Sequence, residues 1–169
     1  MAERLGFKCL IFAEMPRSRF EMMWPNSHWR DGFMIARPDL EADTAIALCC
    51  LMTHGFGGHF IMSLKVTTGM VARANWRELH FSDHIRKMIA EMNLAYFPIL
   101  IIMDDIEAFV DGGPLTRARW QANLALSSDD RIAIDAVGVA ALKCTGRSRP
   151  FNRNEFSNRT RSEERSSSA

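Results

Sequence analysis

The sequence predicts an α/β fold in which a mostly parallel sheet is flanked by helices, as an incomplete domain. Two short stretches, residues 44–51 (TAIALCCL) and 99–103 (ILIIM), are apolar without alternation. Strands of this kind are usually buried on both faces, as in parallel sheets. Segments with the apolar spacing of helices lie between and after them, and this alternation of strands and helices is typical of the α/β class.

The individual elements follow from local patterns. Strands are expected at residues 6–12, 44–51, 99–103 and 122–126. Three segments predict helices. Apolar or small side chains recur at helical spacing in two of them, at Phe60, Leu64, Thr68 and Val71, and at Ile85, Met88, Ile89 and Met92 after a Ser82 N-cap. The third helix is expected to be capped by Asp129 or Asp130 and to run to about Leu142.

The segment from Met15 to Met34 does not fit this scheme. It has no clean periodicity, is rich in Met and aromatic residues, and is interrupted by Pro16 and Pro25. Loops of this length in compact domains are usually lids, binding loops or partner contacts. An extended segment packed over the edge of the core is an equal alternative.

Charge and composition divide the chain near residue 144. Residues 145–169 contain six Arg, three Glu and six Ser and few apolar side chains, which predicts a disordered tail. This tail carries a net charge of +3, whereas the whole chain carries +1, so residues 1–144 carry a net charge of −2. The sequence therefore predicts one α/β domain over residues 1–144 with no specific nucleic-acid binding. Its longest apolar run is too short to span a membrane, and the expected location is the cytoplasm.

The four cysteines predict no metal cluster. Cys9, Cys49, Cys50 and Cys144 show no C-x-x-C spacing, and the adjacent pair lies in an expected strand, where neighbouring side chains point to opposite faces. We expect small buried side chains and no iron–sulfur cluster within this chain.

A glycine-rich turn after the strand at 44–51 is the first candidate site. Glycines allow backbone amides to approach an anion, and a cation follows about two turns later. The candidate anion-binding residues are Thr53, His54, Gly57, Gly58 and Lys65. The turn matches neither common nucleotide-binding fingerprint, so an ordinary tight turn is the alternative.

A second candidate site contains carboxylates, which can bind a divalent metal or act as general acid and base. The candidates are Asp104, Asp111, Asp130 and Asp135, with a turn at Gly112, Gly113 and Pro114. Acidic turn residues are also ordinary features of loops. Asp135 lies in an apolar helical segment, so it should be exposed or hydrogen-bonded to a neighbour.

Three runs of the sequence together carry a family resemblance: THGFGGHFIMSLKVTTGMVA, MDDIEAFVDGGP and LALSSDDRIAIDAVGVAALK. Over residues 3–143 the chain resembles the uncharacterised family called domain of unknown function 362. The resemblance implies a cytoplasmic α/β domain with a redox or metal connection, because some members are fused to ferredoxin-like 4Fe-4S modules. A ferredoxin-like iron–sulfur protein, or missing parts of the same domain, would then be the partner.

The chain departs from the family pattern at several positions. Met52 stands where the family has lysine, Val66 where it has asparagine, and Arg117 where it has glycine; the Asp-Gly element that usually ends the central strand reads Asp104-Asp105. The Asp-x-x-Ala-x-Asp element is intact at Asp130, Ala133 and Asp135. Since Met52 deletes a cation, we hypothesise a truncated and decayed copy of the family domain.

Three functions stay open at this point. The first is an enzyme or redox-linked domain that binds a small anion or divalent metal at the carboxyl ends of the strands. The second is a non-catalytic module that docks to an iron–sulfur partner through residues 15–34. The third is a non-functional fragment. The pocket of the first hypothesis requires that the strands ending near His54 and Asp104 lie side by side and parallel.

Overall fold

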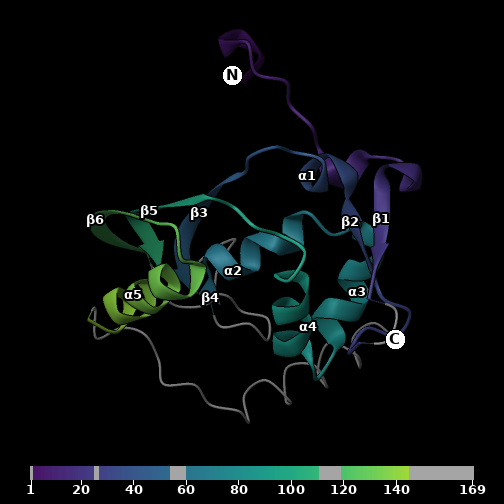
Figure 1. The fold of residues 1–169 in the computed structure, drawn as a ribbon. Helices are drawn as coiled ribbons and strands as arrows, with labels where there is room; N and C mark the ends of the chain where they lie inside the picture. The colour runs from purple at the N-terminus through teal and green to yellow at the C-terminus, as the bar shows by residue number, and fades with distance from the viewer. Residues whose placement is uncertain (1, 25–26, 54–59, 111–118, 145–169) are drawn as a thin grey trace, which may run out of the picture.

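A computed structural model describes residues 2–24, 27–53, 60–110 and 119–144 (Figure 1). Its strands are β1 (Phe20–Met23), β2 (Phe33–Ala36), β3 (Ile46–Thr53), β4 (Phe60–Ile61), β5 (Leu100–Phe109) and β6 (Arg119–Ser128). Its α-helices are α1 (Arg37–Leu40), α2 (Ser63–Val66), α3 (Arg73–Phe81), α4 (Ile85–Met92) and α5 (Arg131–Cys144). Short 3-10 helices cover Ala2–Leu5, Phe12–Glu14, Arg17–Arg19 and Thr67–Gly69.

The larger sheet has the strand order β4-β3-β5-β6 and is mixed. β3 and β5 are parallel, with Ile46 opposite Leu100, whereas β4 and β6 are antiparallel to their neighbours. The α/β class is thus confirmed, but the expectation of a mostly parallel sheet is not met. Only residues 110–118 separate β5 from β6, too few for the crossover that a parallel strand would need.

Helix α5 covers one face of this sheet and forms the main core with it (Figure 1). β3 buries alternate side chains, among them Ala47, Cys49 and Leu51, against that helix, while Ile46 and Leu48 are exposed. The helix comes close because residue 138 is glycine: a Cβ there would lie 3.0 Å from both Cδ1 of Leu51 and Sδ of Met62. The apolar run at 44–51 therefore belongs to a strand with one buried face.

A second core joins the small hairpin β1–β2 to α3 and α4. Trp29, Phe33, Ile35, Leu79 and Met88 are its largest fully buried members. The segment from Met15 to Met34, which showed no periodicity, thus contains β1 and contributes Trp29 and Phe33 to a core. The burial of Trp29 and Phe33 agrees with the second interpretation of this segment, an extended segment packed over the edge of the core.

Several boundaries differ from those expected. Residues 6–12 form no strand, and Phe7, Leu10 and Ile11 are exposed; an apolar run alone does not supply the neighbouring strand that its backbone needs. The single helix expected from Phe60 to Val71 is divided among β4, α2 and a 3-10 turn, and α3 was not predicted. The helices at α4 and α5 are confirmed.

All four cysteines are free, but only Cys49 is buried; Cys9, Cys50 and Cys144 are exposed. The opposite orientations of Cys49 and Cys50 follow the alternation of β3. The expectation that all four are buried is wrong, because Cys9 and Cys144 lie at the ends of the described chain, outside both cores. The predicted tail, residues 145–169, lies outside the described residues.

Candidate functional site

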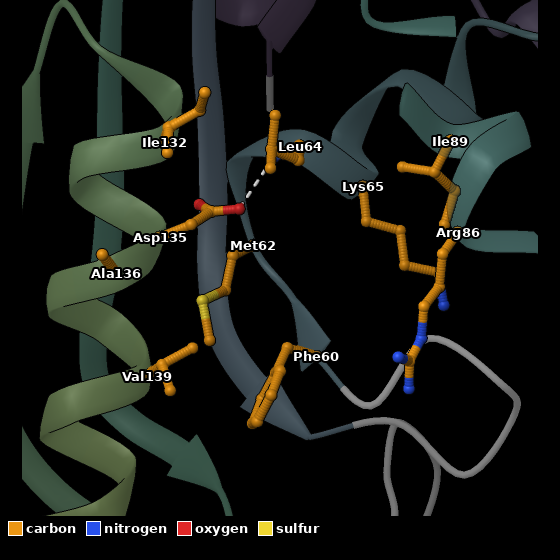
Figure 2. Close-up of a pocket in the computed structure, with 10 residues that line it drawn as sticks. All are labelled: Phe60, Met62, Leu64, Lys65, Arg86, Ile89, Ile132, Asp135, Ala136 and Val139. Carbon is orange, nitrogen blue, oxygen red and sulfur yellow. Dashed lines mark hydrogen bonds between the residues drawn. The ribbon is translucent and has the colours of Figure 1, made fainter. Parts of the chain in front are cut away.

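A cavity of about 460 Å³ lies between β4, α2, α4 and α5 (Figure 2). Its walls are mostly apolar, with two cationic side chains and one carboxylate. The lining residues are Phe60, Met62, Leu64, Lys65, Arg86, Ile89, Ile132, Asp135, Ala136 and Val139. We call this cavity the Lys65 pocket. Its volume falls within the range typical of small-molecule sites.

Lys65 is the unusual residue of this pocket. It is only 6% exposed, and Nζ has no hydrogen-bond partner among the residues that the structure describes. An ammonium group that is removed from water without a partner is costly. Burial accordingly lowers the pKa of Lys65 to about 8. At neutral pH the side chain is still mainly charged, so the pocket contains a desolvated cation.

Arg86 of α4 supplies the second cation. Figure 2 shows the side chains of Lys65 and Arg86 running along one wall of the pocket, while Ile132, Asp135, Ala136 and Val139 of α5 form the opposite wall. Lys65 reaches the pocket from α2 and Arg86 from α4. The wall they form can attract an anion that enters from solvent.

Asp135 faces the pocket from α5, but its carboxylate is already engaged. Oδ1 accepts the backbone N–H of Ser63 at 2.8 Å and lies 2.6 Å from Oγ of Ser63, and Oδ2 accepts the N–H of Leu64 at 3.1 Å. Burial raises the pKa of Asp135, and these hydrogen bonds from Ser63 and Leu64 oppose the shift. The carboxylate thus caps the first turn of α2, as an anion from outside would otherwise do.

Asn93 and Arg131 fix the helices around the pocket. Nδ2 of Asn93 donates to the carbonyls of Leu64 and Ile89 at 2.7 and 2.8 Å. Arg131 in turn donates from Nη1 to Oδ1 of Asn93 at 2.6 Å and from Nη2 to its carbonyl at 3.2 Å. These bonds connect α2, α4 and α5, so the three helical walls are held together by polar contacts as well as by packing.

The structure brings together two residues that the sequence singled out, Lys65 and Asp135, in this one pocket. Asp135 was expected to be exposed or hydrogen-bonded, and the second alternative is confirmed. Thr53 is buried at the end of β3, where Oγ1 donates to the carbonyl of Phe109 at 3.1 Å. His54, Gly57 and Gly58 lie outside the described residues, as do Asp111, Gly112, Gly113 and Pro114.

The other carboxylate candidates lie elsewhere. β3 and β5 are adjacent and parallel as the pocket hypothesis required, but β5 continues to Phe109, so Asp104 is within the strand and not at its end. Asp104 is exposed, and its Oδ1 accepts the N–H of Ile106 at 3.0 Å. Asp130 caps α5 by accepting the N–H groups of Ile132 and Ala133 at 2.7 and 3.0 Å. Both have local structural roles.

No group of three His, Cys, Asp or Glu side chains capable of holding a metal ion exists within residues 2–24, 27–53, 60–110 and 119–144. The expected metal candidates Asp104, Asp130 and Asp135 are spread over β5, the start of α5 and its second turn. Each satisfies backbone N–H groups in its own neighbourhood. The described part of the chain therefore gives the metal hypothesis no support.

Sequence reasoning missed Arg86 and Asn93. Together with Ile89 they follow an i, i+3, i+7 pattern, which places all three on one face of α4. A polar residue at each end of an apolar helical face was the signal that could have found them. Asp105 was also passed over in favour of Asp104: it is fully buried, and neither carboxyl oxygen has a hydrogen-bond partner within the described residues.

Burial raises the pKa of Asp105 to about 6. Strand alternation explains the difference between the two neighbouring aspartates, because Met103 and Asp105 point toward α5 while Asp104 points away from it. Asp105 lies in the core of the sheet and does not line the Lys65 pocket.

Comparisons with known proteins place the chain in one family. Searches of curated proteins and of solved structures each found no match. Within the described residues, none of the helices is both long and apolar enough to cross a membrane. The family model described as "Domain of unknown function (DUF362)" matches residues 1–140 of the 169. The chain therefore belongs to the DUF362 family.

Proposed function

We propose that the protein binds a small anion in the Lys65 pocket. The observation that carries the proposal is made at Lys65. This residue is 6% exposed and lines a cavity of about 460 Å³, and its buried ammonium has no hydrogen-bond partner among the described residues. A buried charge is ordinarily paired. An anion in the cavity would provide the missing partner.

Arg86 supports the same ligand class. Its side chain lines the wall that also carries Lys65, and a guanidinium group suits planar, two-oxygen anions such as carboxylates. Both oxygens of Asp135 accept hydrogen bonds from Ser63 and Leu64, so its carboxylate is held at the start of α2. The proposal concerns binding and assigns no reaction.

Titration calorimetry at pH 7 with acetate, butanoate and inorganic phosphate tests the proposal. We expect at least one of these anions to bind to the full chain and Lys65→Met to abolish or strongly weaken its binding. Lys87→Met is the matched control, because Lys87 is on the same helix as Arg86 but is exposed and does not line the pocket. Failure of all three anions to bind would overturn the proposal.

The redox connection belongs to a second hypothesis. The implied partner is a ferredoxin-like iron–sulfur protein, and the surface proposed for it was the segment from Met15 to Met34. Within that segment Met22 and Trp24 are 47% and 37% exposed, while Trp29 is buried. A pull-down with Met22→Ser compared with the wild-type chain tests whether the exposed part of the segment contacts such a protein.

A further inference from the structure

The apolar lining of the Lys65 pocket says more about the ligand than its charge does. Phe60 of β4, Ile89 of α4, Val139 of α5 and Met62, which connects β4 to α2, surround the cavity. Figure 2 shows Phe60, Met62 and Val139 together, away from the Lys65 and Arg86 wall. Ile132, at the start of α5, also lines the pocket and is 71% exposed. A ligand that covered these side chains would remove apolar surface from water.

The charges of the lining favour a monoanion. Among the described lining residues, Lys65 and Arg86 are positive and Asp135 is negative, a net charge of +1. A single negative charge therefore neutralises the described lining, whereas a dianion such as a phosphate ester would leave an excess negative charge in a partly desolvated site.

The backbone amides that a phosphate group would need are also occupied. The N–H groups of Ser63 and Leu64, in the first turn of α2, already donate to Asp135. Phosphate sites commonly use several such amides together with a cation. What the described part of the pocket offers an incoming anion is side-chain cations, which suits a group with two oxygens.

From these observations, and resting on the proposed function, we infer that the ligand is an aliphatic monocarboxylate. Its carboxylate lies against Lys65 and Arg86, and its hydrocarbon chain lies along Met62, Phe60 and Val139 toward α5. The pocket is then a site for an amphiphilic acid, in which the head group sets the orientation and the chain supplies much of the affinity.

A chain-length series tests this inference. Acetate, butanoate and hexanoate are titrated into the full protein by calorimetry at pH 7, with inorganic phosphate for comparison. Each methylene group that enters an apolar site increases affinity about fourfold. We therefore expect hexanoate to bind far more tightly than acetate, and phosphate more weakly than hexanoate.

Two substitutions on the surface of α5 test where the hydrocarbon chain of the ligand lies. Ala136 lines the pocket and is exposed, so Ala136→Asp introduces a charge beside the expected path of the chain without disturbing the core. We expect Ala136→Asp to weaken hexanoate at least tenfold and acetate only slightly. Ala140→Asp is the matched control, because Ala140 is equally exposed on the same helix and outside the pocket.

The outcomes separate the two proposals. Equal affinities for acetate and hexanoate, both lost in Lys65→Met, would refute the aliphatic ligand and leave anion binding intact. Phosphate binding more tightly than hexanoate would refute it in the same way. If none of the anions binds, the proposed function itself fails.

Discussion

Asp135 of α5 accepts the backbone N–H of Ser63 at the start of α2, with 2.8 Å between Oδ1 and N. This bond joins two residues 72 positions apart in the chain and gives the N–H group of Ser63, in the one-turn helix α2, an internal acceptor. It also orients α2 so that Lys65 is buried on the wall of the cavity. The same contact thus positions α2 beside the pocket and makes the N–H group of Ser63 unavailable to a bound anion.

Loss of this carboxylate should destabilise the fold. Asp135→Ala leaves the N–H groups of Ser63 and Leu64 without acceptors in a largely buried setting, and each such loss costs about 1 to 3 kcal/mol. We expect the free energy of unfolding, measured in urea, to fall by about 2 to 4 kcal/mol. The exposed neighbour Asp129→Ala is the control and should change it little; equal effects of both substitutions would show that Asp135 does not anchor α2.

Lys65→Met should have the opposite effect on stability. The folded pKa of Lys65, about 8, lies below the usual value of 10.5, so between these values the unfolded state binds more protons and stability rises with pH. Below pH 8 the buried charge costs up to about 3 kcal/mol, which methionine removes. We expect the variant to be more stable than wild type at pH 7, with the difference vanishing near pH 10.5. A variant that is less stable at pH 7 would mean that Lys65 is paired.

Asp105 predicts a second pH dependence, of the opposite sign. Its folded pKa of about 6 lies above 3.8, so in this interval the folded state binds more protons and stability falls as pH rises. Asp105→Asn removes the titrating group. The variant should match the wild type near pH 4 and exceed it at pH 7 by up to about 3 kcal/mol in urea unfolding. A pH-independent difference between the two proteins would contradict this account.

Gly138 should tolerate no larger side chain. A Cβ at this position would meet Leu51 and Met62 at 3.0 Å, and a branched side chain would push α5 away from the sheet. Gly138→Val should cost about 1 to 3 kcal/mol more than Ala140→Val, at an exposed position on the same helix. Valine has a higher helix propensity than glycine but a lower one than alanine, so a larger loss at residue 138 can come only from packing. Comparing the two melting curves isolates the packing effect; indistinguishable curves would show that the helix has room at residue 138.

The predictability of this fold differed between its parts for physical reasons. Helix α4 could be predicted because Ile85, Met88 and Met92 repeat with helical spacing. Helix α5 could be predicted because a capping aspartate, Asp129 or Asp130, precedes it. The hairpin β1–β2 could not be predicted, because strands of four residues are too short for alternation to be recognised. Trp29 could not be predicted as a core residue, because it lies in a segment without helix or strand.

The candidate site could be predicted only in part. Lys65 and Asp135 were found as residue types in suggestive places, but their meeting depends on α2 packing against α5, a contact between segments far apart in the sequence. Arg86 reaches the pocket from a third segment. Patterns within one segment of sequence cannot show such convergence. The Lys65 pocket lies beside the sheet, whereas the glycine-rich turn expected to form a site at the strand ends lies outside the described residues.

The pH dependence of butanoate affinity tests the central claim most directly, since butanoate stays ionised while the Lys65 ammonium titrates. We predict that calorimetric affinity is constant below about pH 7 and falls steadily above the Lys65 pKa of about 8, and that Lys65→Met, although stably folded, shows neither the affinity nor the fall. Butanoate binding that is equally strong at pH 7 and pH 10, or that survives in Lys65→Met, would contradict the account.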